Sequence, residues 1–191
     1  MSISPPIAVQ NEYALDEDTR LVLAAQKNPA TFQDVYDRWA KSVYQYFLHR
    51  TGEISSAEDL TSQLFLAAYQ SLPRYQHRGH FAAWLFTIAH NLTRSYYRKK
   101  PPEVSLELAN QIASSSDLPA ESAQAAEIDY LKMLIRLLPD KDQELIRLRY
   151  VVELSFAEMA VVLNKREDAV KKSLYRLQNR LQALLEEQAH G

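Results

Sequence analysis

Proline most constrains what this chain can fold into, because its ring cannot continue a helix and its nitrogen carries no hydrogen. Apart from Pro5 and Pro6, the prolines stand between apolar-periodic segments, at Pro29, Pro73, Pro101, Pro102, Pro119 and Pro139. The segments between them repeat apolar residues every three to four positions, as amphipathic helices do. With only three glycines and no sustained alternation of apolar and polar residues, the sequence predicts an all-α fold.

Three helices are expected before Pro73. The first covers about residues 18–27, and the second follows Pro29, with Asn28 as its cap, and ends at Gly52. The third runs from Ser55 or Ser56 to about Ser71, where Ser55 and Glu58 fit the spacing of a capping box. Their apolar stripes predict a helical core.

The stretch from Pro73 to Lys100 differs in charge from the rest of the chain. It holds six Lys or Arg and no acidic residue, although the whole chain has a formal charge of −2. On a helix, Phe81 and Leu85 belong to one apolar stripe with Ile88, Leu92 and Tyr96, and the other side carries Thr87, His90, Asn91, Arg94 and Arg98. Cations interleaved with aromatic rings suit a single nucleic-acid strand, although a solvated surface is the alternative.

The composition changes again after this stretch. From Pro101 to Asp129 there is no Lys or Arg, and the acidic residues are Glu103, Glu107, Asp117, Glu121, Glu127 and Asp129. We interpret residues 101–121 as an interdomain linker. The predicted organisation is a tail over 1–17, a helical domain over 18–100, the flexible acidic linker, and a second small helical domain over 122–188.

The sequence of the second domain predicts a helix-turn-helix. Ser155 and Glu158 fit a capping box that opens a short helix, and Asn164 follows it, where the chain must turn. Val170 and Leu174 begin an apolar stripe on the last helix, opposite a polar side formed by Lys172, Tyr175, Arg176 and Asn179, with Lys171 on its flank. Such side chains can bind phosphates or base edges in a major groove. The stripe also has heptad spacing, so a coiled-coil helix is the alternative.

Composition excludes several classes of function. The absence of Cys excludes disulfides, thiol catalysis and Cys-ligated zinc, and it fits a reducing compartment. No signal peptide or membrane-spanning run stands out, so the expected location is the cytoplasm. No nucleotide-binding loop, metal-ligand cluster or arrangement of nucleophile and base is evident, so the chain is expected to be no enzyme and to need no cofactor.

Two segments resemble the same family. The segment AEDLTSQLFLAAYQSLPRYQHRGHFAAWLFTIAHNLTRSYYRKK is similar to the second conserved domain of bacterial RNA polymerase sigma factors of the extracytoplasmic-function (ECF) group. The segment LPDKDQELIRLRYVVELSFAEMAVVLNKREDAVKKSLYRLQNRLQALL is similar to their fourth. The resemblance extends from about Leu21 to Leu185 and implies a sigma factor that directs promoter-specific transcription initiation.

The resemblance also implies roles for individual residues. Docking on the clamp of the largest polymerase subunit is implied for Glu58, Asp59, Leu60, Gln63 and Phe65. Recognition of the minus-ten element and capture of its melted non-template strand are implied for Arg74, Tyr75, His77, Arg78, His80, Trp84, Asn91, Arg94, Arg98, Lys99 and Lys100. Recognition of the minus-thirty-five element is implied for Lys165, Arg166, Lys171, Lys172, Ser173, Tyr175, Arg176 and Asn179. The implied partners are core RNA polymerase, including the flap of its second-largest subunit, promoter DNA and an anti-sigma factor.

The chain departs from the family pattern at several positions. Ser62-Gln63 stands where Gln and an acidic residue are usual, and Lys172-Ser173 stands where Ser-Arg is usual. A minus-thirty-five preference outside the standard consensus is therefore expected. Two other interpretations remain open from the sequence, namely an autonomous helix-turn-helix regulator that never joins the polymerase and a helical adaptor whose basic faces are only solvated.

Overall fold

The computed structural model describes residues 16–76, 79–99 and 123–190, and within these ranges it contains helices and turns but no strand. The first lobe, residues 16–99, consists of α1 (Glu17–Lys27), α2 (Phe32–Thr51), α3 (Ile54–Ser71) and α4 (Phe81–Lys99), with 3₁₀ turns at Pro29–Thr31 and Leu72–Arg74. The second lobe, residues 123–190, consists of α6 (Ala123–Leu137), α7 (Asp140–Ile146), the π-helical segment η4 (Arg147–Val151), α8 (Phe156–Leu163) and α9 (Glu167–His190). The all-α prediction is confirmed.

Local sequence signals explain most of the helix ends. The Asp16 carboxylate caps α1 by accepting from the Thr19 amide at 2.8 Å, and Asn28 accepts from the Ala30 amide at 3.2 Å. Gly52 ends α2 in the left-handed region, with φ of 71°. The helix expected after Pro29 thus begins as a 3₁₀ turn and continues as α2.

The capping box predicted at Ser55 and Glu58 is wrong. Helix α3 already begins at Ile54, and Glu53 is the residue before its first turn. The Glu53 carboxylate accepts from the hydroxyls of Ser55 at 2.9 Å and Ser56 at 2.7 Å. Ser55 and Ser56 therefore lie inside the first turn of α3, where both hydroxyls bind the Glu53 carboxylate.

The helix-turn-helix is formed by α8 and α9, and both of its predicted signals are confirmed. The Ser155 hydroxyl accepts from the Glu158 amide at 3.2 Å, and the Glu158 carboxylate accepts from the Ser155 amide at 2.8 Å. Asn164 ends α8 in the left-handed region, with φ of 50°. The chain therefore turns within three residues into the long helix α9.

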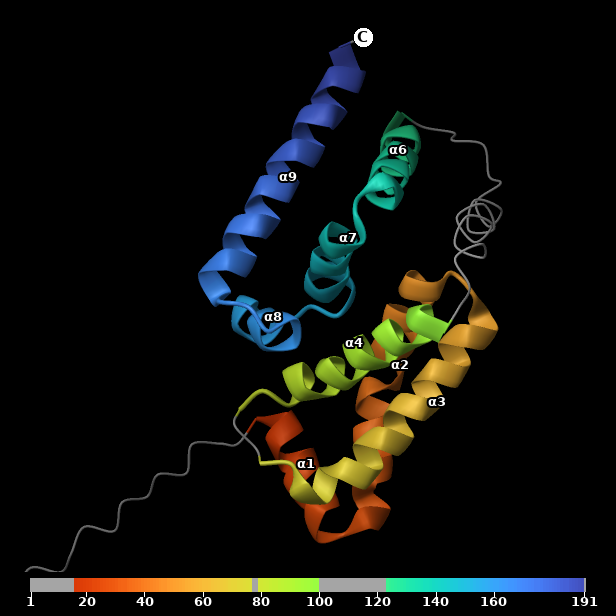
Figure 1. Cartoon of the computed structure of the whole chain (residues 1–191), viewed down its shortest axis with the longest axis vertical. Coiled ribbons are helices and arrows are strands. Elements are labelled where there is room, and N and C mark those ends of the chain that lie inside the picture. Colours follow the sequence, from red (N-terminus) through yellow and green to blue (C-terminus); the bar gives the residue numbers. More distant parts are fainter. Residues whose placement is uncertain (1–15, 77–78, 100–122, 191) are drawn as a thin grey trace, which may run out of the picture.

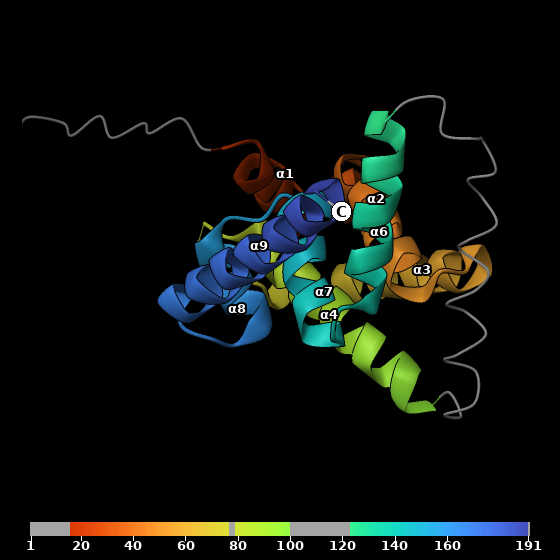
Figure 2. The same ribbon diagram turned by 90° about the horizontal axis from the view of Figure 1, so that it is seen from above.

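The two lobes pack against each other (Figure 1). Helix α8 lies along α4, and η4 contacts α2. Buried residues of the first lobe, such as Phe86 and Ala89, belong to the same apolar cluster as Met159 and Val162 of the second. In the perpendicular view, α7, α8 and α9 overlie the first lobe (Figure 2). A smaller cluster of Leu138, Leu177 and Leu181 holds α9 against α6 and α7. The predicted linker, 101–121, lies outside the described residues.

Candidate nucleic-acid interface

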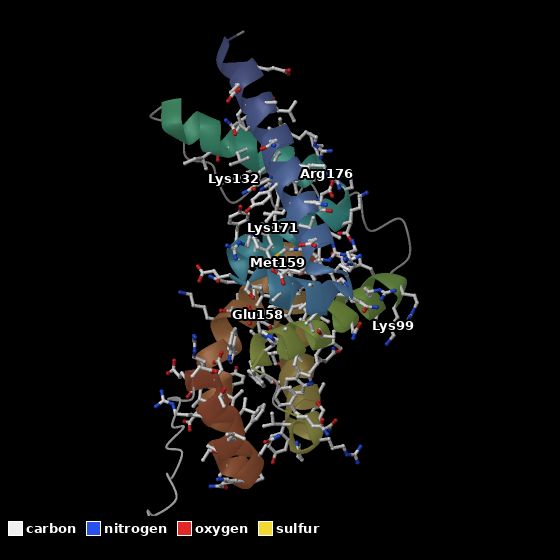
Figure 3. All side chains as sticks on the ribbon, turned by 90° about the vertical axis from the view of Figure 1, so that its left-hand side faces the viewer. Lys99, Lys132, Glu158, Met159, Lys171 and Arg176 are labelled. Atoms are coloured by element: carbon white, nitrogen blue, oxygen red, sulfur yellow. The ribbon has the colours of Figure 1, made fainter. Side chains whose placement is uncertain are left out.

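Helix α4 presents a cationic face because its apolar side is used by the core. Phe81 and Leu85 are buried, and Ile88, Leu92 and Tyr96 pack against the same cluster. Four predicted minus-ten residues are exposed on the helix: Asn91, Arg94, Arg98 and Lys99. Lys99 lies at the end of α4 away from α8 (Figure 3). His77, Arg78 and Lys100 were also predicted there, but they lie outside the described residues.

An aromatic corner precedes this face. The ring centroid of Trp84 lies 4.7 Å from that of Tyr75 and 5.3 Å from that of Phe81, with tilted planes. The side-chain amide of Gln26 donates to the carbonyls of Leu72 at 2.9 Å and Tyr75 at 2.6 Å, which fixes the turn on α1. Tyr75 and Trp84 are half-buried, whereas the neighbouring Arg74 and His80 are exposed. The corner combines flat rings and cations, as a site for an unstacked base requires.

The second cationic face is on α9. Val170, Leu174 and Leu177 are buried, whereas the predicted minus-thirty-five residues Lys171, Lys172, Tyr175, Arg176 and Asn179 are exposed, as are Lys165 and Arg166 in the turn. Ser173 is half-buried. Lys171 Nζ lies 5.9 Å from the Phe156 ring and 6.0 Å from the Tyr175 ring, which places its charge between the start of α8 and α9 (Figure 3). Because the apolar stripe packs inside its own chain, the coiled-coil alternative is not supported.

Helix α3 carries an acidic and apolar face. Glu58, Asp59 and Gln63 are exposed, in agreement with a contact role. Leu60 and Phe65 are not contact residues, because only 3% and 5% of their surfaces are exposed and both lie in the core. The sequence prediction missed Leu66 and Tyr69, which are 58% and 46% exposed. Helical spacing could have identified this exposed side, because it places Leu66 on the same side of the helix as the polar residues Asp59 and Gln63.

Both cationic faces lie in regions that match known protein families. Residues 35–101 match the family model for Sigma-70 region 2, and residues 128–188 match that for Sigma-70, region 4. The ECF RNA polymerase sigma factor BldN of Streptomyces coelicolor is 35% identical over 189 residues, covering 92% of this chain and 70% of BldN. This chain belongs to the ECF sigma factors of the sigma-70 family.

Other relatives support the same assignment of this sigma factor. The ECF RNA polymerase sigma factor SigW of Bacillus subtilis is 30% identical over 156 residues, covering 76% of this chain and 83% of SigW. The solved structure of CnrH in complex with the cytosolic domain of CnrY matches with a TM-score of 0.65 at 25% identity, covering 89% of this chain and 97% of that chain. The chain is therefore a sigma factor that directs transcription initiation, and the alternatives of an autonomous regulator and an adaptor are not supported. Sigma factors act by binding, which agrees with the prediction that this protein is not an enzyme.

A search of the described helices for one that is long and apolar enough to cross a membrane finds none.

The sigma factor buries a polar cluster between its lobes. The Tyr46 hydroxyl of α2 donates to Glu144 Oε1 of α7 at 2.7 Å, and His90 Nδ1 of α4 lies 3.1 Å from the same oxygen. Arg147 Nε donates to Glu144 Oε2 at 3.1 Å. His90 was predicted on the polar side of α4, but the second lobe covers it.

The partners of Glu144 decide its charge. Burial alone raises the pKa of a carboxyl group, but the hydrogen bond from His90, the charge of Arg147 and the hydrogen bond from Tyr46 outweigh it and lower the pKa of Glu144 to about 2. Burial, together with the Glu144 charge, raises the pKa of Tyr46 well above its usual value. Glu144 is thus ionised and Tyr46 is a donor at neutral pH.

The low pKa of Glu144 predicts acid sensitivity. An unfolded Glu titrates near pH 4.5, so its stabilising contribution is complete above that pH and is lost as the pH falls toward about 2. Urea unfolding between pH 7 and pH 3 should show a smaller loss of unfolding free energy for Glu144→Gln than for the parent. Glu187→Gln, an exposed position on α9, is the matched control and should follow the parent. Equal pH slopes in all three proteins would contradict the prediction.

Proposed function

We propose that this sigma factor reads the minus-ten element with α4 and the turn before it, and the minus-thirty-five element with α9. The predicted domains, 18–100 and 122–188, would then each carry one reading helix. The observation that carries the proposal is that two helices far apart in the sequence each combine a buried apolar stripe with an exposed cationic side.

The chemistry of this proposal is binding. At the minus-ten element, the corner of Tyr75 and Trp84 offers aromatic faces beside Arg74 and His80, and Asn91 supplies an amide farther along α4. Unstacking a base costs a few kcal/mol, and stacking on aromatic side chains returns about 1–3 kcal/mol per base. Strand opening would therefore draw on binding free energy and not on ATP.

The second reading helix is suited to duplex DNA. Arg176 can donate two hydrogen bonds to guanine and Asn179 can pair with adenine, whereas Lys171 and Lys172 suit phosphates. Lys165 and Arg166 lie in the turn that a helix-turn-helix brings close to the DNA backbone. The division into base-reading and phosphate-binding side chains predicts different responses to salt.

The proposal also includes protein partners. We infer that the exposed side of α3, with Glu58, Asp59, Gln63 and Leu66, docks on the clamp of the largest polymerase subunit, and that the second lobe docks on the flap of the second-largest. An anti-sigma partner, which the family resemblance implies, is also proposed. CnrH, a structural relative, was solved in complex with a second protein, the cytosolic domain of CnrY.

Mixing the purified chain with the core RNA polymerase of its own bacterium tests this function. The expected result is co-elution on size exclusion and new promoter-specific run-off transcripts from genomic fragments. Asp59→Arg should weaken co-elution at least about tenfold, because it reverses an exposed charge on the proposed docking side. Asp34→Arg on α2 is also at an exposed position and serves as the control. Failure of the parent to co-elute or to support transcription would refute the proposed function.

A further inference from the structure

One side chain of α1 bonds to both ends of the turn that carries Tyr75. Gln26 Nε2 donates to the Leu72 carbonyl at 2.9 Å and to the Tyr75 carbonyl at 2.6 Å, across 46 and 49 positions of the sequence. An amide nitrogen carries two hydrogens, so Gln26 can make both bonds at once. Leu72 is the first residue of the 3₁₀ turn and Tyr75 is the residue that follows it. The turn is therefore held at its start and at its end.

Helix α1 gives this amide a fixed origin. Val22 and Ala25 are buried, with 0% and 4% of their surfaces exposed. Gln26 lies on the same side of the helix, four positions after Val22 and next to Ala25. The helix contacts both the turn and α4 (Figure 1). The core of the first lobe thus decides where the Gln26 amide lies, and the amide in turn decides where the turn lies.

The turn itself is short. The Tyr75 amide donates to the Leu72 carbonyl at 3.0 Å, and Leu72 is 2% exposed, which anchors the first residue. Pro73 has no amide hydrogen to add a further backbone bond. Tyr75 then leaves the turn in an extended conformation, with φ of −67° and ψ of 123°. Because the peptide unit is planar, the direction of the Tyr75 carbonyl depends on this ψ, and the bond from Gln26 fixes it.

The backbone at Tyr75 decides where its ring lies. The ring centroid is 4.7 Å from that of Trp84, with planes tilted by 40°, and 5.7 Å from that of Phe81, edge-on at 76°. Phe81 and Trp84 both belong to α4, and Phe81 is 2% exposed, so the helix fixes two of the three rings. Tyr75 is the ring that belongs to a turn. The shape of the aromatic corner therefore depends on the bonds that Gln26 makes.

A preformed corner favours the uptake of an unstacked base. If the Tyr75 ring is already in place, the free energy of stacking is not reduced by the entropy of ordering the turn. Tyr75 and Trp84 are half-buried, so both rings keep some exposed surface, and Arg74 next to them is an exposed cation. A loose turn would offer the same side chains in many arrangements and would bind a base more weakly.

We propose that Gln26 is a positioning residue for base capture, because its bonds to the carbonyls of Leu72 and Tyr75 hold the Tyr75 ring against Trp84. The inference rests on the proposed role of this turn at the minus-ten element. Gln26 acts through Tyr75 and needs no contact with DNA. Its loss should weaken the capture of a base of the non-template strand and should leave polymerase docking and duplex reading by α9 unchanged.

Tryptophan fluorescence of the full chain tests the position of the corner without DNA or polymerase. The sequence contains two Trp, of which Trp39 is 7% exposed and Trp84 is half-buried, so acrylamide quenching reports mainly on Trp84. Gln26→Met removes both hydrogen bonds and keeps the side-chain length and the helix propensity. It should raise the quenching constant, because Tyr75 is then free to move away from Trp84.

Gln33→Met is the matched control, because it removes an amide whose bond lies away from the corner. Gln33 Nε2 donates to Asp37 Oδ1 at 2.7 Å on the exposed side of α2. This variant should be quenched like the parent, and circular dichroism should show equal helix content in all three proteins. A quenching constant of Gln26→Met equal to that of the parent would overturn the positioning of the corner by Gln26.

Promoter opening tests the consequence for base capture. With core RNA polymerase and a promoter identified by run-off, permanganate reactivity of the minus-ten thymines measures the open complex. Gln26→Met should lower the equilibrium constant for opening about tenfold, the effect of losing two hydrogen bonds of ordinary strength. Its co-elution with core polymerase should match that of the parent, and Gln33→Met should open the promoter like the parent.

Promoters that lack one base of the non-template strand give a readout that a general loss of stability would not change. The base is removed at one minus-ten position at a time. At the position whose base is captured, the parent should lose opening, and the difference between the parent and Gln26→Met should vanish. No loss with the intact promoter, or an undiminished difference at every position, would overturn the role in base capture. If the parent itself opens no promoter, the proposed function fails, while the fluorescence still decides whether Gln26 positions the corner.

Discussion

Replacing both Lys172 and Arg176 with alanine is expected to reduce transcription from a cognate promoter by about a hundredfold at limiting sigma concentration. Both side chains are exposed on α9, beside the buried residues Leu174 and Leu177, so their removal leaves the packing of the helix unchanged. A well-placed bidentate contact to a base contributes about 1–3 kcal/mol of discrimination, and a phosphate contact adds affinity that falls with salt. The double variant should therefore also show a flatter salt dependence, by about one unit of slope, because only Lys172 is assigned to a phosphate.

The measurement is run-off transcription over a series of salt concentrations with a promoter that carries both elements. Arg20→Ala with Lys27→Ala is the matched control, because it removes the same charge from exposed positions on α1. That control should keep the activity and the salt slope of the parent. Circular dichroism should show equal helix content in all proteins. Unchanged transcription in the Lys172 and Arg176 variant would contradict the assignment of α9 as the reading helix.

Local signals predicted most of the fold. Ser155 with Glu158 and the left-handed Asn164 identified the helix-turn-helix, because both signals depend only on residues within one turn of each other. The capping box predicted at Ser55 failed for a related reason. The hydroxyls of Ser55 and Ser56 bind the Glu53 carboxylate, and no sequence rule says whether Glu53 or Ser55 precedes the first turn of the helix. Apolar periodicity gave the exposed face of α9 correctly, because the stripe at Val170 and Leu174 packs within the chain.

The packing of the lobes was beyond prediction from sequence. Glu144 shares a helical segment with Leu145 and Leu148, and nothing local pairs it with Tyr46, which lies 98 positions earlier. His90 was placed on the polar side of α4 by its angle on the helix, and that angle is correct. The surface beyond it is protein and not solvent, because Glu144 of α7 lies 3.1 Å from His90 Nδ1. Likewise, Leu60 and Phe65 were assigned to a contact from family resemblance, whereas the core takes their side chains.

Replacing Arg147 with methionine should lower the free energy of unfolding by about 3 kcal/mol. The side chain of Arg147 is 7% exposed, and its Nε donates to Glu144 Oε2 at 3.1 Å. Methionine preserves the length and the apolar part of the side chain, so the main loss is the charge that faces a buried carboxylate. Removing one partner of a buried pair costs about 3–5 kcal/mol, because the remaining charge is left without compensation. Urea unfolding at pH 7 measures the change.

Arg38→Met is the control for losing an arginine that is paired at the surface. Its Nε lies 3.6 Å from Glu17 and 3.7 Å from Asp18, and its side chain is 47% exposed, so the expected cost is below about 1 kcal/mol. Adding Glu144→Gln to Arg147→Met should recover at least about 1 kcal/mol, since a neutral amide needs no counterion. Additive losses in the double variant would show that Arg147 stabilises the seam by packing alone. Recovery would show that charge pairing at Glu144 holds the two lobes in register.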